Sequence, residues 1–194
     1  GLGKSEPQES CATQKSMPLK KLYLNGTANI KDLAPLQGMA LVELHLHLCP
    51  QFDNRDLAVL RGMPLTTLDL SGTQVTDLRD FKDMPLTTLQ VRGTKVKDLS
   101  PLKGMKLQQL DLGGTLVSDL RPLEGMPLQT LYLENCPNIK DISPLKGMPV
   151  SYLSLNACSG IKDLTPLAEC KELCGLTIPA QCKGKTIEFL RDLP

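Results

Sequence analysis

Leucines and polar residues alternate in short stretches that recur along this chain. One such stretch reads T-L-D-L-S, in which Leu68 and Leu70 are separated by Asp69. Successive side chains of an extended backbone point to opposite sides, so the two leucines share one side. Thr67, Asp69 and Ser71 share the other side. The pattern therefore predicts a short strand with one buried face and one polar face.

A second pattern, D-L-x-P-L-x-G-M, follows most of these stretches. Aspartate suits the cap of a short helical turn, proline suits its first turn, and glycine can adopt the left-handed conformation that ends it. The few residues between aspartate and glycine predict a 3₁₀ or single-turn helix in each copy. The aspartates expected to cap these turns are Asp32, Asp77, Asp98, Asp119, Asp141 and Asp163.

The strand pattern and the turn pattern together repeat eight times. Successive copies start 21 to 24 residues apart. A unit that repeats at such a period cannot bury its apolar side alone and stacks on its neighbours, so the strands should pair in parallel in one gently curved sheet. The leucines expected at the strand centres are Leu22, Leu44, Leu68, Leu89, Leu110, Leu131, Leu153 and Leu176.

The complete unit, L-x-x-L-x-L-x-x-T/C followed by D-L-x-P-L-x-G-M, resembles the leucine-rich repeat. Its short period and its D-L/I-S-P-L turn are most similar to the internalin type of bacterial repeat. Its G-M-P-L ending resembles repeats of large bacterial multidomain proteins, some of which also contain a serine/threonine kinase domain. The resemblance implies an α/β right-handed solenoid, with a curved parallel sheet on the concave side and short 3₁₀ or helical turns on the convex side.

Three segments are expected along the chain. Residues 17–185 should form the array of eight repeats. The polar residues 1–16 are typical of a disordered linker or of residues added during cloning. Residues 186–194 should form a short amphipathic helix that caps the last repeat with Ile187 and Leu190.

Charge and hydropathy exclude two classes of partner for this fragment. The 22 basic and 21 acidic side chains give a net charge of +1, which provides no long-range field for nucleic acid or for an anionic membrane. No apolar run approaches the ~20 residues needed to span a bilayer. We therefore expect a monomer that contacts neither nucleic acid nor membrane.

The seven cysteines are an odd number, which excludes a complete internal disulfide framework. Cys49, Cys136 and Cys158 occupy a repeat position that is threonine elsewhere, so we expect buried thiols that bond the backbone. Unpaired cysteines favour a reducing, cytoplasmic compartment. Exposure at the cell surface would follow instead if the parent protein is an adhesin or a membrane-anchored kinase.

The polar strand positions define the candidate binding surface. All three tyrosines and both histidines of the chain occupy such positions. Tyrosine is common in binding hot spots, although it is also simply a favourable strand residue. The residues expected to bind a ligand on the concave face are Tyr23, His45, His47, Asp69, Arg92, Asp111, Tyr132, Glu134, Tyr152 and Asn156.

Two groups of residues raise the question of a metal. His45 and His47 lie on one side of a strand with Glu43 and Asp69 alongside, which could bind a divalent ion. Zinc sites usually have three or four ligands and a supporting shell, and the pattern specifies neither. We interpret the histidines as solvated side chains that add pH sensitivity to binding, and assign no metal or other cofactor. The spacing of the last cysteines is likewise not a zinc motif: Cys170, Cys174 and Cys182.

No catalytic motif is present. Asp69 and Asp111 share a column of the predicted sheet, but they lie two strands apart, roughly 10 Å, on a surface expected to be open and unable to shift a pKa. A nucleophile with a base, a phosphate loop and a kinase motif are all missing. We therefore expect a protein that is not an enzyme.

Two functions remain. The first is an interaction module that binds a protein or peptide on its concave face. The second is a structural spacer or a sensory or regulatory arm of a larger bacterial multidomain protein, such as a serine/threonine kinase. Replacing the tyrosines should distinguish them, because only the first function requires these side chains.

Overall fold

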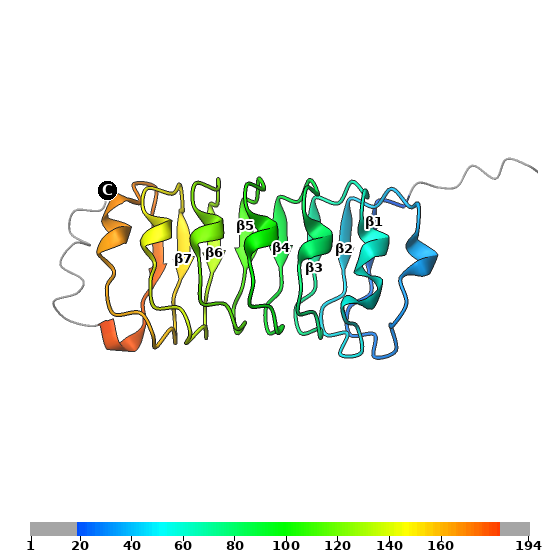
Figure 1. Cartoon of the computed structure of the whole chain (residues 1–194), viewed down its shortest axis with the longest axis horizontal. Coiled ribbons are helices and arrows are strands. Elements are labelled where there is room, and N and C mark those ends of the chain that lie inside the picture. Colours follow the sequence, from blue (N-terminus) through cyan, green and yellow to red (C-terminus); the bar gives the residue numbers. More distant parts are fainter. Residues whose placement is uncertain (1–18, 183–194) are drawn as a thin grey trace, which may run out of the picture.

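The computed structural model describes residues 19–182 and confirms one array of stacked repeats (Figure 1). The strands pair in parallel, in sequence order, in a single sheet. The predicted leucines lie at the strand centres, each opposite the next. The strands are β1 Lys21–Tyr23, β2 Glu43–His45, β3 Thr67–Asp69, β4 Thr88–Gln90, β5 Gln109–Asp111, β6 Thr130–Tyr132, β7 Tyr152–Ser154 and β8 Gly175–Thr177.

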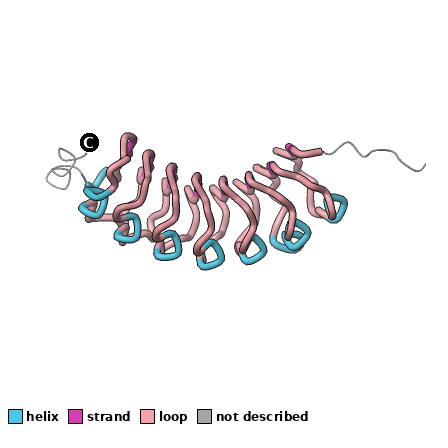
Figure 2. The backbone as a smooth tube through the Cα atoms, turned by 90° about the horizontal axis from the view of Figure 1, so that it is seen from above, coloured by secondary structure: helices cyan, strands magenta, loops and turns pink. Residues whose placement is uncertain are grey.

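The second half of each repeat forms a short 3₁₀ helix, as predicted. Proline occupies the first turn of five of the helices. Figure 2 shows the array from above: the strands follow the inner side of a gentle arc and the row of helices follows its outer side. The helices are η1 Ala34–Leu36, η2 Asn54–Leu60, η3 Arg79–Phe81, η4 Ser100–Leu102, η5 Arg121–Leu123, η6 Ser143–Leu145, η7 Thr165–Glu169 and η8 Ala180–Cys182.

The predicted aspartates stabilise these helices from one position earlier than expected. The N-cap of η4 is Leu99, whose side chain is buried. Asp98 precedes it, and its Oδ1 accepts a hydrogen bond of 2.8 Å from the backbone N–H of Ser100, the first helical residue. The other five aspartates accept the equivalent bond. Leucine occupies the N-cap position because its side chain packs in the core. The aspartate carboxylate before it still accepts a hydrogen bond from a backbone N–H that the helix itself leaves without a partner.

Left-handed backbone closes the helical turns, as predicted. Gly104, after η4, has φ of 80°. Asp83 has φ of 65° at the same place after η3, where the repeat lacks its glycine. A non-glycine residue is disfavoured in this conformation, and aspartate is among the side chains that tolerate it best.

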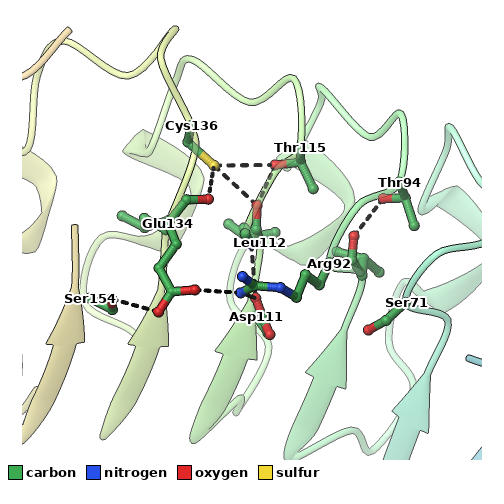
Figure 3. A network of polar contacts seen from close by, with 12 residues as sticks. Ser71, Arg92, Thr94, Asp111, Leu112, Thr115, Glu134, Cys136 and Ser154 are labelled. Atoms are coloured by element: carbon green, nitrogen blue, oxygen red, sulfur yellow. Dashed lines mark hydrogen bonds and ion pairs between the residues drawn. The ribbon is translucent and has the colours of Figure 1, made fainter. Parts of the chain in front are cut away.

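The threonine and cysteine column bonds the backbone in two different ways. Thr115 Oγ1 donates to the carbonyl of Leu112 in its own repeat at 2.7 Å, whereas Cys136 Sγ donates to the same carbonyl from the next repeat at 3.1 Å (Figure 3). The thiol of Cys158 also reaches back one repeat, to Leu133. Burial raises the pKa of Cys158 to about 11, so this thiol stays protonated and acts as a donor.

The core runs the length of the array without interruption. The leucines at the centres of β2 to β6 have no exposed surface. Each strand contacts the strands before and after it, which is the linear contact pattern of a solenoid. Within residues 19–182, no helix has the length and apolar content needed to cross a membrane. The predicted linker 1–16 and capping helix 186–194 lie outside the described residues.

Candidate binding surface on the concave sheet

The strand pairing places the polar strand positions in the predicted columns. One column contains Tyr23, His45 and Asp69 in neighbouring strands, and continues to Asp111 and Tyr132. The side chains form three groups: an N-terminal cluster on β1 to β3, a central network reaching from β4 to β8, and a tyrosine pair on β6 and β7. The ten predicted residues thus share one sheet face without forming a single site.

Glu43 lies at the centre of the N-terminal cluster. Its carboxylate accepts a 2.8 Å hydrogen bond from the Tyr23 hydroxyl and pairs with Lys21 Nζ at 2.8 Å. His45 Nε2 lies 2.9 Å from the same carboxylate. Hydrogen bonds from Lys21, Tyr23 and His45 together lower the pKa of Glu43 to about 2. This side chain is therefore an anion at physiological pH and fixes the three groups around it.

The remaining members of the N-terminal cluster are His47 and Asp69. The Tyr23 ring stacks on the His45 ring with centroids 4.9 Å apart. On its other side, His45 Nδ1 lies 3.6 Å from Asp69 Oδ2, and His47 Nδ1 lies 3.3 Å from the same oxygen. The expectation of solvated imidazoles is therefore wrong for His45, whose side chain is only 18% exposed, because Tyr23 and Glu43 cover it.

The central network is a chain of polar contacts between five consecutive repeats, part of which is shown in Figure 3. Arg92 Nη1 lies 2.7 Å from Glu134 Oε2 and 3.8 Å from Asp111 Oδ1. The Ser154 hydroxyl donates to Glu134 Oε1 at 2.8 Å and lies 2.7 Å from the hydroxyl of Thr177. Hydrogen bonds from Ser154 and Arg92 hold the pKa of Glu134 below its usual value. Each charged group of the network thus has an opposite charge or a donor beside it.

Gly113 makes this network possible, and our sequence reasoning missed its role. A Cβ atom at Gly113 would lie 2.5 Å from Arg92 Nη1. The missing side chain lets the guanidinium pass over the segment that follows β5 and reach Glu134, which follows β6. The signal in the sequence is a glycine in a column that is polar in the neighbouring repeats. Ser154 and Thr177 were also missed, because small hydroxyl residues are ordinary on an exposed strand.

The expectation that Asp69 and Asp111 lie on an open surface is wrong. Their exposed fractions are 7% and 9%. Each carboxylate turns back to accept the N–H two residues further on, from Ser71 at 2.9 Å and from Gly113 at 2.8 Å. Burial raises the pKa of Asp111 despite this bond and the nearby Arg92.

The raised pKa of Asp111 predicts that Asp111→Asn stabilises the array near neutral pH. An acid whose folded pKa is raised lowers stability above that pKa, and the loss disappears as the pH falls through it. Asparagine keeps the bond to Gly113 without a buried charge, so we expect a gain on the order of 1 kcal/mol at pH 7. Urea unfolding of both proteins from pH 7 to pH 3 measures the difference. A wild type that is more stable at pH 7 would show that the attraction of Arg92 outweighs burial.

The tyrosine pair adjoins the central network. The rings of Tyr132 and Tyr152 have centroids 5.5 Å apart and are tilted by 50°. Tyr152 is 36% exposed, and it lies over Gly175, where a Cβ atom would come within 2.5 Å of its ring. Asn156 follows β7 and is exposed. The pair therefore presents an aromatic surface whose position is set by β6, β7 and β8.

The three cysteines near the end of the array do not form a metal site. The thiols of Cys170, Cys174 and Cys182 donate to carbonyls of three different residues, Leu145, Ser151 and Ile161. In the part of the chain that the structure describes, His45, His47 and Asp69 alone form a group with metal-ligand spacing. A surface hollow lies elsewhere, between the turns around Met84 and Met105.

Comparison with known structures supports the interpretation of the repeats. Internalin C2 from Listeria monocytogenes superposes with a TM-score of 0.67 at 31% identity, covering 76% of this chain and 66% of that one. Internalin F from the same organism superposes with a TM-score of 0.55 at 20% identity, covering 90% and 65%. The sequence matches no family model and no curated protein. The chain thus spans just under two thirds of the two internalins and has an internalin-like leucine-rich repeat fold.

Proposed function

We propose that this chain, an internalin-like leucine-rich repeat solenoid, is a non-enzymatic module that binds a protein or peptide across the tyrosine pair of its concave sheet. The observation that carries the proposal is the aromatic surface formed by half-buried Tyr132 and exposed Tyr152 beside the charged central network. Tyrosine supplies a large contact area and a hydroxyl at low entropic cost, which is why it is frequent in binding hot spots.

Preorganisation is the physical reason that this surface suits binding. Tyr152 is held between Tyr132 and Gly175, and Arg92 and Glu134 already pair with each other. Side chains that are fixed before association lose little conformational freedom when a partner arrives. The sheet beneath them is rigid because Leu131 and Leu153, at the centres of β6 and β7, are buried.

The charges around the tyrosine pair indicate the kind of contact. Arg92 is balanced by Asp111 and Glu134, so the central network carries a small net negative charge and no strong field. We therefore expect a contact based on aromatic packing and hydrogen bonds rather than on electrostatic steering. Such a contact should depend weakly on salt.

The test uses peptides selected from a random display library on the immobilised chain. Affinities for the selected peptides are then measured by fluorescence anisotropy. We expect the double variant Tyr132→Ser/Tyr152→Ser to bind them at least about 10-fold more weakly, because a central aromatic contact contributes more than 1 kcal/mol. Circular dichroism and the melting temperature check that the double variant still folds.

Leu116→Ser is the matched control, since it also removes an exposed apolar side chain but lies outside the strands. It should leave the affinities unchanged. Equal affinities for the wild type and the double variant would overturn the proposal, and so would a failure to select any peptide. Either result would favour the role of a spacer or regulatory arm.

A further inference from the structure

The N-terminal cluster has a feature that partner binding on β6 and β7 does not explain. One atom each from His45, His47 and Asp69 lies within 4.8 Å of the other two. His45 ends β2, His47 lies two residues beyond it, and Asp69 of β3 is opposite His45 in the sheet. From this geometry we propose that the three side chains bind a divalent transition-metal ion of the zinc class.

The distances fit a shared ion better than direct contact. Asp69 Oδ2 lies 3.3 Å from His47 Nδ1 and 3.6 Å from His45 Nδ1, and neither pair makes a hydrogen bond. Zinc–nitrogen and zinc–oxygen bonds of ~2.0–2.2 Å place the ligand atoms of a tetrahedral site about 3.3–3.6 Å apart. The two separations from Asp69 therefore match edges of such a site, and all three ligand atoms lie within 4.8 Å of one another, so only a small side-chain adjustment is needed to complete it.

The hydrogen bonds around the cluster orient the ligand atoms. The Glu43 carboxylate lies 2.9 Å from His45 Nε2 and accepts a hydrogen bond from it. In the neutral imidazole this bond leaves the lone pair of Nδ1 facing Asp69 Oδ2, where a cation can bind both atoms. Histidines that bind metals commonly donate their other N–H to a carboxylate in this way.

The carboxylate of Asp69 is also oriented by a hydrogen bond. Its Oδ1 accepts the N–H of Ser71 at 2.9 Å, which fixes the carboxylate and leaves Oδ2 directed at the two imidazoles. Asp111 is the equivalent residue two strands further on and makes the same bond to Gly113. The neighbour of Asp111 in the preceding repeat, however, is Arg92 and not a pair of imidazoles. The ligand arrangement is therefore specific to β2 and β3.

The donor set selects the class of ion. Two imidazole nitrogens and one carboxylate oxygen suit zinc and its first-row neighbours, whereas calcium and magnesium prefer oxygen ligands. His47 is 38% exposed, so solvent on the concave side can reach the ion. Water or a side chain of a bound partner would complete the coordination.

Zinc binding by the untagged full-length chain tests the proposal. A Cys174→Ser background removes the thiol that is exposed among the described residues. Calorimetric titration should show one equivalent of bound Zn²⁺, which His47→Gln and Asp69→Asn should each abolish. Asp111→Asn makes the same chemical change at the equivalent position and should retain the full equivalent. Cobalt substitution should give the absorption of a tetrahedral ion without a thiolate charge-transfer band.

Glu43→Gln tests the supporting shell. It should keep the stoichiometry of one ion but weaken the affinity by about 10- to 100-fold, the usual effect of removing such a partner. Undiminished binding in Asp69→Asn, a thiolate band with cobalt, or the absence of binding in the wild type would each overturn the proposal. Melting temperatures without metal confirm that the variants are folded. The experiment is independent of the tyrosine pair, so either proposal can fail without the other.

Discussion

Replacing Leu110 with aspartate should destabilise the array by about 3–5 kcal/mol, the usual cost of an uncompensated buried charge. Leu110 is the central residue of β5 and has no exposed surface. Its neighbours in register are Leu89 and Leu131, which offer no hydrogen-bond donor to a carboxylate. The new side chain must therefore be buried without a partner or be expelled together with its strand.

Hydrogen exchange measures how far this damage spreads. Contacts in a solenoid join neighbouring repeats, so amide protection should fall first in β4 to β6 and persist further away. Leu22→Asp is the matched control, because Leu22 occupies the same column but is only partly buried at the end of the described sheet. Leu22→Asp should lower the free energy of unfolding clearly less than Leu110→Asp does. Equal losses from both substitutions, or a uniform loss of protection, would contradict this view of the array.

The register of the fold could be predicted from the sequence because a single residue type marks it. Leucines at fixed spacing determine which side chains face the core, and the strand pairing follows the same order from Leu22 to Leu176. The alternating residues then fall into columns without further information. The strand register and the columns of the sheet, which depend only on the leucine period, can therefore be predicted from the sequence alone.

Burial of the polar columns could not be predicted in this way. Asp69 and Asp111 alternate with leucines like any outward residue, yet hydrogen bonds to their own turns and side chains from neighbouring strands cover them. Arg92 covers Asp111 only because Gly113 lies between them and Glu134 attracts it. Such effects depend on three strands at once, which a pattern within one repeat does not contain.

The roles of the acidic residues in the N-terminal cluster could not be predicted from the sequence either. The spacing of His45 and His47 indicated two ligands on one strand, and both Glu43 and Asp69 were expected beside them. The structure instead directs Glu43 to His45 Nε2, where Lys21 and Tyr23 also hold it, and leaves Asp69 as the third ligand atom. The choice between ligand and supporting residue was made by side-chain orientation, which the column order alone does not determine.

Phe81→Ala should cost about 3–5 kcal/mol of unfolding free energy, the usual result of deleting a buried aromatic ring. Phe81 ends η3 and is fully buried on the convex side. The equivalent position is leucine in the adjacent helices, Leu60 in η2 and Leu102 in η4. Neighbours packed at both sides limit how far the repeat can collapse into the space that alanine leaves, so the cavity should persist.

Phe81→Leu is the matched control, because it restores the side chain that the adjacent repeats use at this position. We expect it to cost clearly less than Phe81→Ala, because leucine leaves a smaller cavity than alanine does. Urea unfolding of the three proteins provides the free energies. A leucine variant as unstable as the alanine variant would mean that the convex turn requires the aromatic ring itself. The row of helices would then be built from individually fitted turns, in contrast to the interchangeable leucines of the strands.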